Sequence, residues 1–220
     1  MNLLKMRRKR VGFLLLITII VLFIIYSTQK SYKEEDCTVS EGVQAKLQDL
    51  TKKVIEVLNI LKLTNFLCYT SLWGALKYNG PMPWQSKLEL CLLNEEVLKI
   101  EEAYFIKSFK QHGLILSYDS GNGVYHVTNV DDNSCEALLI VFEEDSITHQ
   151  IRRVGWKNRL LPPDSCEALH CFPPHLVSLP LPTHNFMKMK LPVPREEIEI
   201  QKYLFPNSWW REVEPPICKS

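Results

Sequence analysis

Residues 65–93 decide the fold of this 220-residue chain and read NFLCYTSLWGALKYNGPMPWQSKLELCLL. Residues 66–69 predict a short strand and residues 71–78 a short helix, which the breaker cluster Asn79-Gly80-Pro81 ends. Residues 87–93 alternate at first and then become apolar, as a strand does when it enters a core. A strand, a helix and a second strand so close together indicate an α+β domain.

The sequence on both sides of this stretch predicts further elements of the same domain. They are a helix over 43–61 that Ser40 could cap, a helix over 94–111 with Val97, Ile100, Tyr104 and Phe105 facing inward, a hairpin of strands 114–118 and 124–128, a strand over 137–142 and a short helix over 195–204. Residues 162–194 contain eight prolines, which exclude a regular helix there. We therefore expect a small mixed β-sheet with flanking helices, behind an N-terminal transmembrane helix.

The N-terminal residues predict a membrane anchor. Residues 11–29 carry no charge and follow a basic cluster at residues 7–10, so they could form a spanning helix, which needs roughly 17–25 residues, with a cytosolic N-terminus. A cleaved signal peptide is the alternative, although residues 26–29 do not resemble a cleavage site. We expect residues 1–10 to be a cytosolic tail, 11–29 a signal-anchor, 30–41 a stem and 42–220 a luminal domain.

The charge of the chain is unevenly distributed. The net charge is +1, but residues 1–30 contain six basic and no acidic side chains, so the 26 basic and 25 acidic residues of the chain leave 20 against 25, or −5, for residues 31–220. A body of that sign is a poor electrostatic partner for nucleic acid. No nucleic-acid ligand is therefore expected.

All seven cysteines follow the predicted anchor and would face an oxidising compartment, where disulfides persist. Cys68 and Cys91 lie in apolar runs and are interpreted as buried free thiols. The candidates for disulfides or metal ligands are Cys135, Cys166, Cys171 and Cys218. Cys166 and Cys171, with His170 and His175 nearby, have the spacing for a local disulfide or for a structural zinc site, and both alternatives stay open.

The stretch from Tyr69 to Trp84 resembles the opening motif of the LicD/fukutin family. In that motif an aromatic-rich strand is followed by Tyr-Gly-Thr-Leu-Leu-Gly-Ala-Val-Arg, a basic residue, Gly, a hydrophobic residue, Pro-Trp and a run of aspartates. Residues 179–181, 189–194 and 203–209 resemble the family's closing pattern of a Pro-Leu turn, a strand ending in Val-Pro and a Tyr-Gly-x-x-Trp tail. The resemblance covers roughly residues 65–210, in the right order.

This resemblance implies a nucleotidyltransferase-like fold and a role in glycan modification. Members of the family move phosphocholine, ribitol phosphate or a similar phospho-alcohol from a nucleotide donor to a glycan. Eukaryotic members are Golgi type II membrane proteins, so the resemblance implies a Golgi or endoplasmic reticulum membrane protein with its body in the lumen.

The family's metal-binding acids are mostly replaced in this chain. Where the family has Asp-Asp-Asp-Ile-Asp, residues 85–89 read Gln-Ser-Lys-Leu-Glu, so the two positions on one face of the strand hold Lys87 and Glu89. One interpretation is that Glu89 and Glu143 or Glu144 still bind Mg²⁺ or Mn²⁺ in altered geometry. The favoured interpretation is that metal catalysis is lost, with Lys87 free to pair with Glu89.

The rest of the motif is better retained, and the resemblance implies substrate-binding roles for several of its residues. They are Ser71, whose hydroxyl could meet a phosphate, the glycines Gly74 and Gly80, where close backbone approach or special torsions are needed, and the cations Lys77 and Lys87. The alternatives are an ordinary helix start for Ser71 and a solvated side chain for Lys77. Trp73 and Trp84 are interpreted as core residues.

Three classes of function are compatible with these observations. The first is a luminal phospho-alcohol transferase, and the second is a catalytically degenerate relative that binds a nucleotide, a glycan or another transferase. The third is a membrane-tethered structural protein without a ligand site. The shortness of the body favours the binding and helper classes slightly.

Overall fold

The computed structural model describes residues 16–22, 38–159, 170–211 and 213. Contacts divide the chain into a compact unit, Thr38–Pro216, and a second unit of Met1–Cys37 with Ile217–Ser220. Residues 16–22 are helical and exposed, and the rest of the predicted anchor over 11–29 lies outside the described residues. Within the described ranges, none of the helices is long and apolar enough to cross a membrane.

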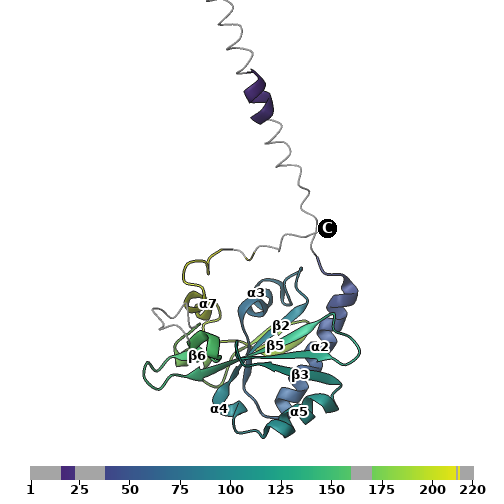
Figure 1. Ribbon diagram of the computed structural model, residues 1–220, viewed down its shortest axis with the longest axis vertical. Coiled ribbons are helices and arrows are strands. Elements are labelled where there is room, and N and C mark those ends of the chain that lie inside the picture. The colour runs from purple at the N-terminus through teal and green to yellow at the C-terminus, as the bar shows by residue number, and fades with distance from the viewer. Residues whose placement is uncertain (1–15, 23–37, 160–169, 212, 214–220) are drawn as a thin grey trace, which may run out of the picture. The chain divides into compact units, whose positions relative to one another are not determined.

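The compact unit is built on a mixed β-sheet in the order β1-β2-β5-β4-β3, with β6 paired to the end of β5 (Figure 1). The strands are β1 (Asn65–Leu67), β2 (Lys87–Leu93), β3 (Leu114–Asp119), β4 (Val124–Asn129), β5 (Glu136–Glu144) and β6 (Ile151–Arg153). β2 and β5 run parallel, whereas the other neighbours are antiparallel. This arrangement confirms the predicted α+β class with a mixed sheet and flanking helices.

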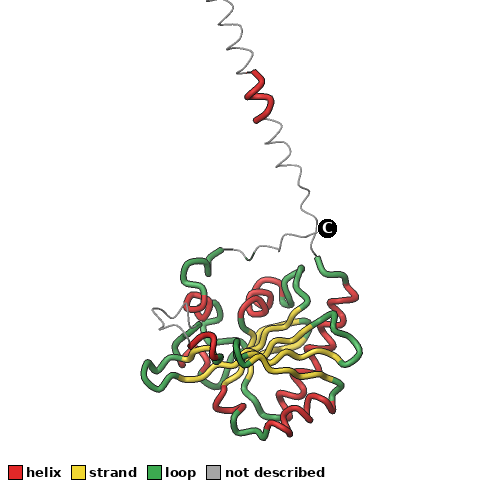
Figure 2. The backbone as a smooth tube through the Cα atoms, in the orientation of Figure 1, coloured by secondary structure: helices red, strands yellow, loops and turns green. Residues whose placement is uncertain are grey.

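Helices cover the sheet on both faces (Figure 2). They are α2 (Glu41–Ile60), α3 (Tyr69–Tyr78), α4 (Asn94–Val97), α5 (Glu102–Gln111) and α7 (Glu199–Leu204), with 3-10 turns at Trp156–Arg159 and Pro174–Val177. A separate hairpin of β7 (Thr183–Phe186) and β8 (Met189–Pro192) lies within the proline-rich segment and contacts α3 and β1. The described part of that segment, residues 170–194, is therefore irregular with strand fragments, as its prolines predict.

The apolar stripe of α2 forms the base of the core. Leu47, Leu50, Val54 and Val57 are fully buried, which confirms the helix predicted from their spacing. Ser40 occupies the N-cap position of α2, but its side chain makes no capping hydrogen bond. α2 contacts β2, β4 and β5, so the helix covers the centre of one sheet face.

The helix expected over 94–111 is two helices, because residues 98–101 interrupt it. Val97 and Phe109 are both buried, although they would lie roughly 120° apart around the axis of one continuous helix. The interruption lets both side chains reach the core. Tyr104, which was predicted to face inward, is instead 51% exposed, whereas Phe109 is fully buried in the core.

Cys68 and Cys91 form a disulfide with an S–S distance of 2.13 Å, so their interpretation as free thiols is wrong. The bond joins β2 to the residue that precedes α3, and both cysteines are fully buried. A short apolar run cannot reveal this pairing, because it depends on how α3 returns to β2. Cys135 shows the opposite error: it is a buried free thiol, although the sequence made it a candidate for bonding.

Candidate functional site

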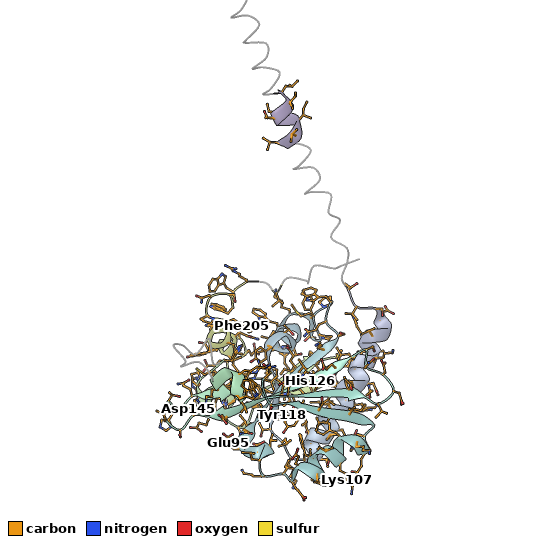
Figure 3. The ribbon with its side chains drawn as sticks, in the orientation of Figure 1. Glu95, Lys107, Tyr118, His126, Asp145 and Phe205 are labelled. Carbon is orange, nitrogen blue, oxygen red and sulfur yellow. A yellow bond between two sulfur atoms is a disulfide. The ribbon has the colours of Figure 1, made fainter. Side chains whose placement is uncertain are left out.

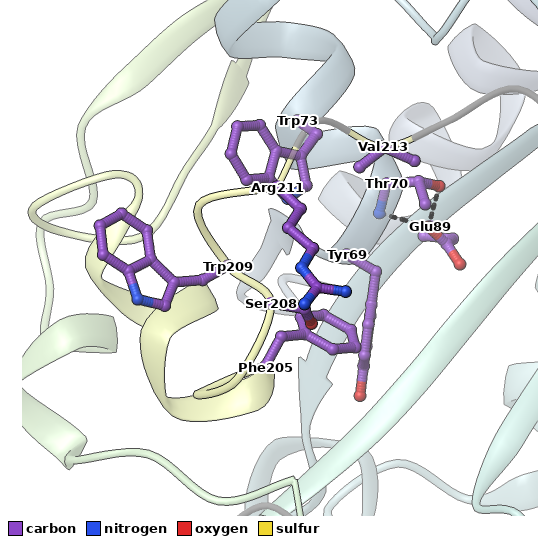
Figure 4. A pocket seen from close by; sticks show the side chains of 9 residues that line it. All are labelled: Tyr69, Thr70, Trp73, Glu89, Phe205, Ser208, Trp209, Arg211 and Val213. Atoms are coloured by element: carbon purple, nitrogen blue, oxygen red, sulfur yellow. Dashed lines mark hydrogen bonds between the residues drawn. The ribbon is translucent and has the colours of Figure 1, made fainter.

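A cavity of about 570 Å³ lies between the start of α3, the strand β2 and the segment that follows α7 (Figure 4). Its first wall consists of Tyr69, Thr70, Trp73 and Glu89. Its second wall consists of Phe205, Ser208, Trp209, Arg211 and Val213. Four aromatic rings, three hydroxyls, one carboxylate and one guanidinium therefore line a single space, which is the composition of a ligand-binding pocket.

Tyr69 is held at the base of this cavity in an uncommon backbone conformation. Its φ is +49°, in the left-handed region that bulky residues rarely adopt. Its carbonyl accepts a hydrogen bond from Nε2 of Gln201 at 2.8 Å, and its hydroxyl lies 3.2 Å from Nδ1 of His170. Such strained residues persist where the surrounding structure fixes them, often at functional sites.

The environment of Tyr69 also changes its acidity. Burial raises the pKa of the Tyr69 hydroxyl to about 12, while the nearby guanidinium of Arg153, 6.0 Å from the ring centre, acts in the opposite direction. The phenol is therefore neutral at physiological pH. It can donate or accept a hydrogen bond there, but it cannot serve as an anionic base.

Glu89 binds the N-terminal turn of α3 from the neighbouring strand. One of its carboxylate oxygens accepts the backbone N–H of Thr70 at 2.8 Å and the Thr70 hydroxyl at 2.5 Å. Gln85 donates a further hydrogen bond to that hydroxyl. The carboxylate caps α3, where free N–H groups and the helix dipole favour negative charge.

Lys87 lies on the same face of β2 as Glu89, but the pairing with Glu89 that the sequence left open is not formed. Its ammonium lies 2.9 Å from a carboxylate oxygen of Glu136, the residue opposite it on β5. The other oxygen of Glu136 lies 2.6 Å from Nδ1 of His126. Burial alone would raise the pKa of Glu136, but Lys87 and His126 outweigh it and lower that pKa.

The structure does not bring Glu143 near Glu89. Glu89 is opposite Leu138 on β5, five positions before Glu143, which corresponds to roughly 16 Å along a strand. Glu143 instead lies 3.4 Å from the guanidinium of Arg152, and Glu144 lies at the same far end of β5. The two predicted carboxylate ligands therefore occupy opposite ends of the sheet.

The positions of Glu89, Glu143 and Glu144 show whether the described residues could bind the divalent metal ion that the fold implies. Mg²⁺ is held by several carboxylate oxygens and gives up water reluctantly. In the described part of the chain, three or more His, Cys, Asp or Glu side chains never gather in an arrangement that could hold a metal ion. Glu89 is committed to Thr70 and Lys87 brings a positive charge to the same strand, so the described residues do not fit a catalytic metal.

The predicted substrate-binding residues are spread over this region. Ser71 is fully buried, and its hydroxyl accepts the backbone N–H of Glu89 at 2.8 Å. Lys77 is exposed, with its ammonium 5.8 Å from the centre of the Trp73 ring. Lys87 belongs to the Glu136 pair described above. None of these three residues lines the cavity of about 570 Å³, and their roles in binding substrate stay predictions.

The two predicted glycines differ. A Cβ on Gly74 would lie 2.4 Å from the carbonyl oxygen of Gly80, so the close backbone approach expected at Gly74 is present. Gly80 itself has no such contact, and the left-handed torsion after α3 belongs to Asn79, with φ of +52°. Gly74 therefore keeps the loop after α3 packed against that helix.

The structure describes Cys171 but not Cys166, the two cysteines that their spacing predicts to lie close together. Cys171 is disulfide-bonded, so its sulfur is not a zinc thiolate, whereas Cys166 lies outside the described residues. His170 directs Nδ1 at the hydroxyl of Tyr69. The local pairing of Cys166 with Cys171 stays a prediction.

Sequence reasoning missed most of the second wall. The sequence predicted no part in a site for Ser208, Trp209 or Arg211. Trp73 was assigned to the core but is half-buried at the cavity. The Trp-Trp-Arg sequence at residues 209–211 was the one signal available for this wall. Its meaning depends on the tertiary structure, which places the tail opposite α3.

Residues 62–196 match the family described as LicD/FKTN/FKRP, nucleotidyltransferase domain. This chain belongs to that family. The match spans more than half of the sequence and includes α3, β2, β5 and the first wall of the cavity. The match ends at residue 196, before the residues 205–213 that supply the second wall. No curated protein matches the chain.

Proposed function

We propose that this protein is a catalytically degenerate LicD-family member that serves as a membrane-anchored binding or helper protein in glycan phospho-modification. The observation that carries the proposal is the state of Glu89. It is the one acid left in the run of residues 85–89, and it is bound to the start of α3 through Thr70. A carboxylate that already accepts these hydrogen bonds from Thr70 is poorly placed to bind a metal ion.

The positive charge of Lys87 supports the same proposal. A cation on the face that carries the family's acids opposes the binding of Mg²⁺ or Mn²⁺. Glu136 lies across from Lys87, and its carboxylate is already shared between that ammonium and His126. These contacts support a chain that keeps the family's fold but carries a different set of charges on β2.

The proposed location is the membrane of the Golgi or endoplasmic reticulum, with a single type II anchor over residues 11–29 and the body in the lumen. The uncharged stretch after a basic cluster supports this orientation. The disulfide between Cys68 and Cys91 supports an oxidising compartment. The proposed partners are the membrane and a glycan, a nucleotide or another glycan-modifying transferase.

The alternative is an active transferase that moves a phospho-alcohol from a nucleotide donor to a glycan, and membership of the family favours it. Calorimetry of the purified full-length protein with Mg²⁺ or Mn²⁺ separates the two functions. The wild-type protein should bind neither metal detectably. Lys87→Asp should bind Mn²⁺, because it places a new carboxylate beside Glu136 and on the same face as Glu89.

Lys107→Asp is the matched control, since it makes the same charge change at an exposed position of α5. It should leave metal binding absent. Metal-dependent phospho-alcohol transfer by the wild-type protein, abolished by Glu89→Ala, would contradict the proposal and restore the enzyme.

A further inference from the structure

The two outer edges of the sheet differ in how far they are covered. At one edge, β1 has three residues, all buried, and it contacts β8 of the separate hairpin. At the other edge, β3 has six residues, and β4 is the only strand of the described ranges that pairs with it. Ile115, Ser117 and Tyr118 of β3 are exposed. The outer edge of β3 is therefore open to a further strand.

β3 also lacks the features that usually protect an open edge. Proteins keep such edges apart with lysine or proline side chains, with very short strands or with β-bulges. β3 reads Leu-Ile-Leu-Ser-Tyr-Asp, without lysine or proline. It pairs with β4 in one unbroken register, from Leu114 opposite Asn129 to Asp119 opposite Val124, and so contains no bulge. An edge of this kind is a template for pairing with another chain.

The hydrogen bonds of β3 show which of its backbone groups face the open edge. The carbonyl of Gly113, just before the strand, accepts the N–H of Val130 at 3.0 Å. Backbone groups alternate in direction along an antiparallel strand, so Ile115 directs its own groups at β4, as Gly113 does. Leu114 and Leu116 therefore direct their N–H and C=O groups outward.

Exposed apolar side chains lie beside this edge. Ile115 is 50% exposed and Val130 is 55% exposed. Val130 lies opposite Gly113, two positions before Ile115, so both side chains are on one face of the hairpin. Tyr118 is 46% exposed and contacts Tyr125, with ring centres 4.4 Å apart. A strand that joined β3 would cover part of this apolar surface.

The charges at the two ends of β3 favour a second copy of this chain as the added strand. The start of β3 lies beside the exposed side chains of Lys110 and Asp131. Its end is Asp119, and the exposed Lys157 packs against the turn that follows. Each end thus carries one cation and one anion. A partner strand with charges of a single sign would meet a like charge at each end, whereas an antiparallel copy brings both signs to both ends.

We propose that two copies of this chain pair through β3 in an antiparallel, two-fold symmetric ladder that continues the sheet from one protomer into its partner. The register centred on Ile115 places Leu114 opposite the partner's Leu116, which matches their outward groups, and covers Ile115 with its own copy. The dimer goes beyond the proposed function, which requires no second copy. β5 and β4 separate β3 from β2, and Figure 3 shows Tyr118 apart from Phe205, so the interface does not include the cavity.

The first test exchanges charge at the symmetry axis of purified full-length protein in detergent, with sedimentation equilibrium as the measurement. Wild type should dimerise. Ile115→Lys and Ile115→Glu should each weaken the dimer about 10-fold or more, because two like charges then lie opposite each other. An equimolar mixture of the two variants should restore the dimer, because opposite charges then meet. Ile147→Lys, at a residue 88% exposed between β5 and β6, is the matched control and should dimerise as wild type does.

The second test traps the proposed register. Ile115→Cys places two thiols on residues whose Cα atoms would lie about 4.5 Å apart in a non-hydrogen-bonded pair, which a disulfide can bridge. Oxidised glutathione should convert most of this variant into a disulfide-linked dimer on non-reducing gels. Ile147→Cys should give no more of that dimer than wild type, whose own cysteines set the background. Because Ile115 is half-exposed, Ile115→Cys should keep the circular dichroism of wild type.

The outcomes separate this inference from the proposed function. A monomeric wild type, or a dimer that Ile115→Lys leaves intact, would overturn the pairing through β3. A mixture of Ile115→Lys and Ile115→Glu that stays monomeric would overturn it too, as would an Ile115→Cys variant that cross-links no more than Ile147→Cys. None of these results changes the proposed function, which metal-dependent transfer activity of the wild-type protein would instead contradict.

Discussion

The two faces of β2 have opposite properties although their residues alternate along one strand. Leu88, Leu90 and Leu92 point toward the face that α2 covers, and all three are fully buried. Lys87 and Glu89 point to the other face, where α3 and the C-terminal segment leave a cavity. Successive side chains of a strand alternate between faces, so neighbouring residues enter different environments.

The seven residues of β2 therefore contribute to the stability of the core with one face and to the cavity region with the other. The covered face is held by apolar burial, whose loss unfolds the domain. The other face carries the hydrogen bonds and ion pairs of the exposed Lys87 and the half-buried Glu89, which cost little to rearrange, and also the buried disulfide between Cys68 and Cys91. Polar residues on one face of β2 can therefore be exchanged while the apolar residues of the other face keep the fold intact.

The largest expected effect comes from the covered face. Leu90→Ala should lower the free energy of unfolding by about 2 to 5 kcal/mol, because a fully buried side chain is replaced by a cavity. Denaturation in urea measures it. Leu98→Ala, at a residue 74% exposed, is the control and should stay within about 0.5 kcal/mol of wild type. Equal effects of the two variants would contradict the buried position of Leu90.

The second effect concerns Tyr69, at the base of the cavity. Its folded pKa of about 12 lies above the ordinary value of 10.0, so between these pH values the unfolded chain loses a proton that the folded chain keeps. Stability contributed by this group is present below pH 10 and is lost as pH rises toward 12, by about 2 to 3 kcal/mol.

Urea denaturation of wild type and Tyr69→Phe between pH 9 and 12, roughly the window given by these pKa values, isolates this loss. The wild type should lose stability relative to the variant as pH rises. Tyr104→Phe, at a residue 51% exposed, provides the comparison. Parallel curves for wild type and Tyr69→Phe would show that the phenol is not buried.

A smaller effect is expected at Glu89 itself. Glu89→Ala should cost about 1 to 2 kcal/mol, because α3 loses the carboxylate that accepts the Thr70 N–H. This value lies between the negligible cost of an exposed acid and the several kcal/mol of a broken buried ion pair. A double-mutant cycle with Thr70→Val measures the part that passes through the hydroxyl. A loss above about 4 kcal/mol would require a buried partner charge.

The smallest effect is expected for Lys87, which is 53% exposed. Lys87→Gln should cost less than about 1 kcal/mol, as is usual for exposed ion pairs. Glu136 contributes stability that is present above its ordinary pKa and is lost as pH falls through its lowered folded pKa. Acid denaturation of Lys87→Gln should therefore show a shallower loss than wild type, whereas a steeper loss would contradict the pairing.

Much of the fold could be predicted because it depends on local patterns. The stripe of α2, the alternation of β2 and the turn between β3 and β4 all appear in the observed elements. The break at residues 98–101 could not be predicted, because no local signal marks it and burial of both Val97 and Phe109 decides it. The disulfide between Cys68 and Cys91 was also missed, because it depends on how α3 packs against β2 and no local signal marks it.

The candidate site was predicted less well than the fold. The sequence identified Glu89 and Lys87 and their shared face, and it left open whether they pair with each other. The register between β2 and β5 decides otherwise, since it places Glu136 opposite Lys87 and leaves Glu143 at the far end of the sheet. Partner choice across strands depends on register, which the residues of one strand do not specify.

The sequence by itself determined the α+β class, the family and the composition of residues 85–89, because each depends on the order of residues along the chain. Only the tertiary structure decided that Glu89 caps α3, that Tyr69 is a buried neutral phenol, and that Arg211 lies in the same cavity as both. The first fact depends on how β2 packs against α3, and the other two depend on contacts between segments more than 100 residues apart, such as the start of α3 and the tail after α7. Burial and charge at a site are properties of that assembly rather than of any one segment.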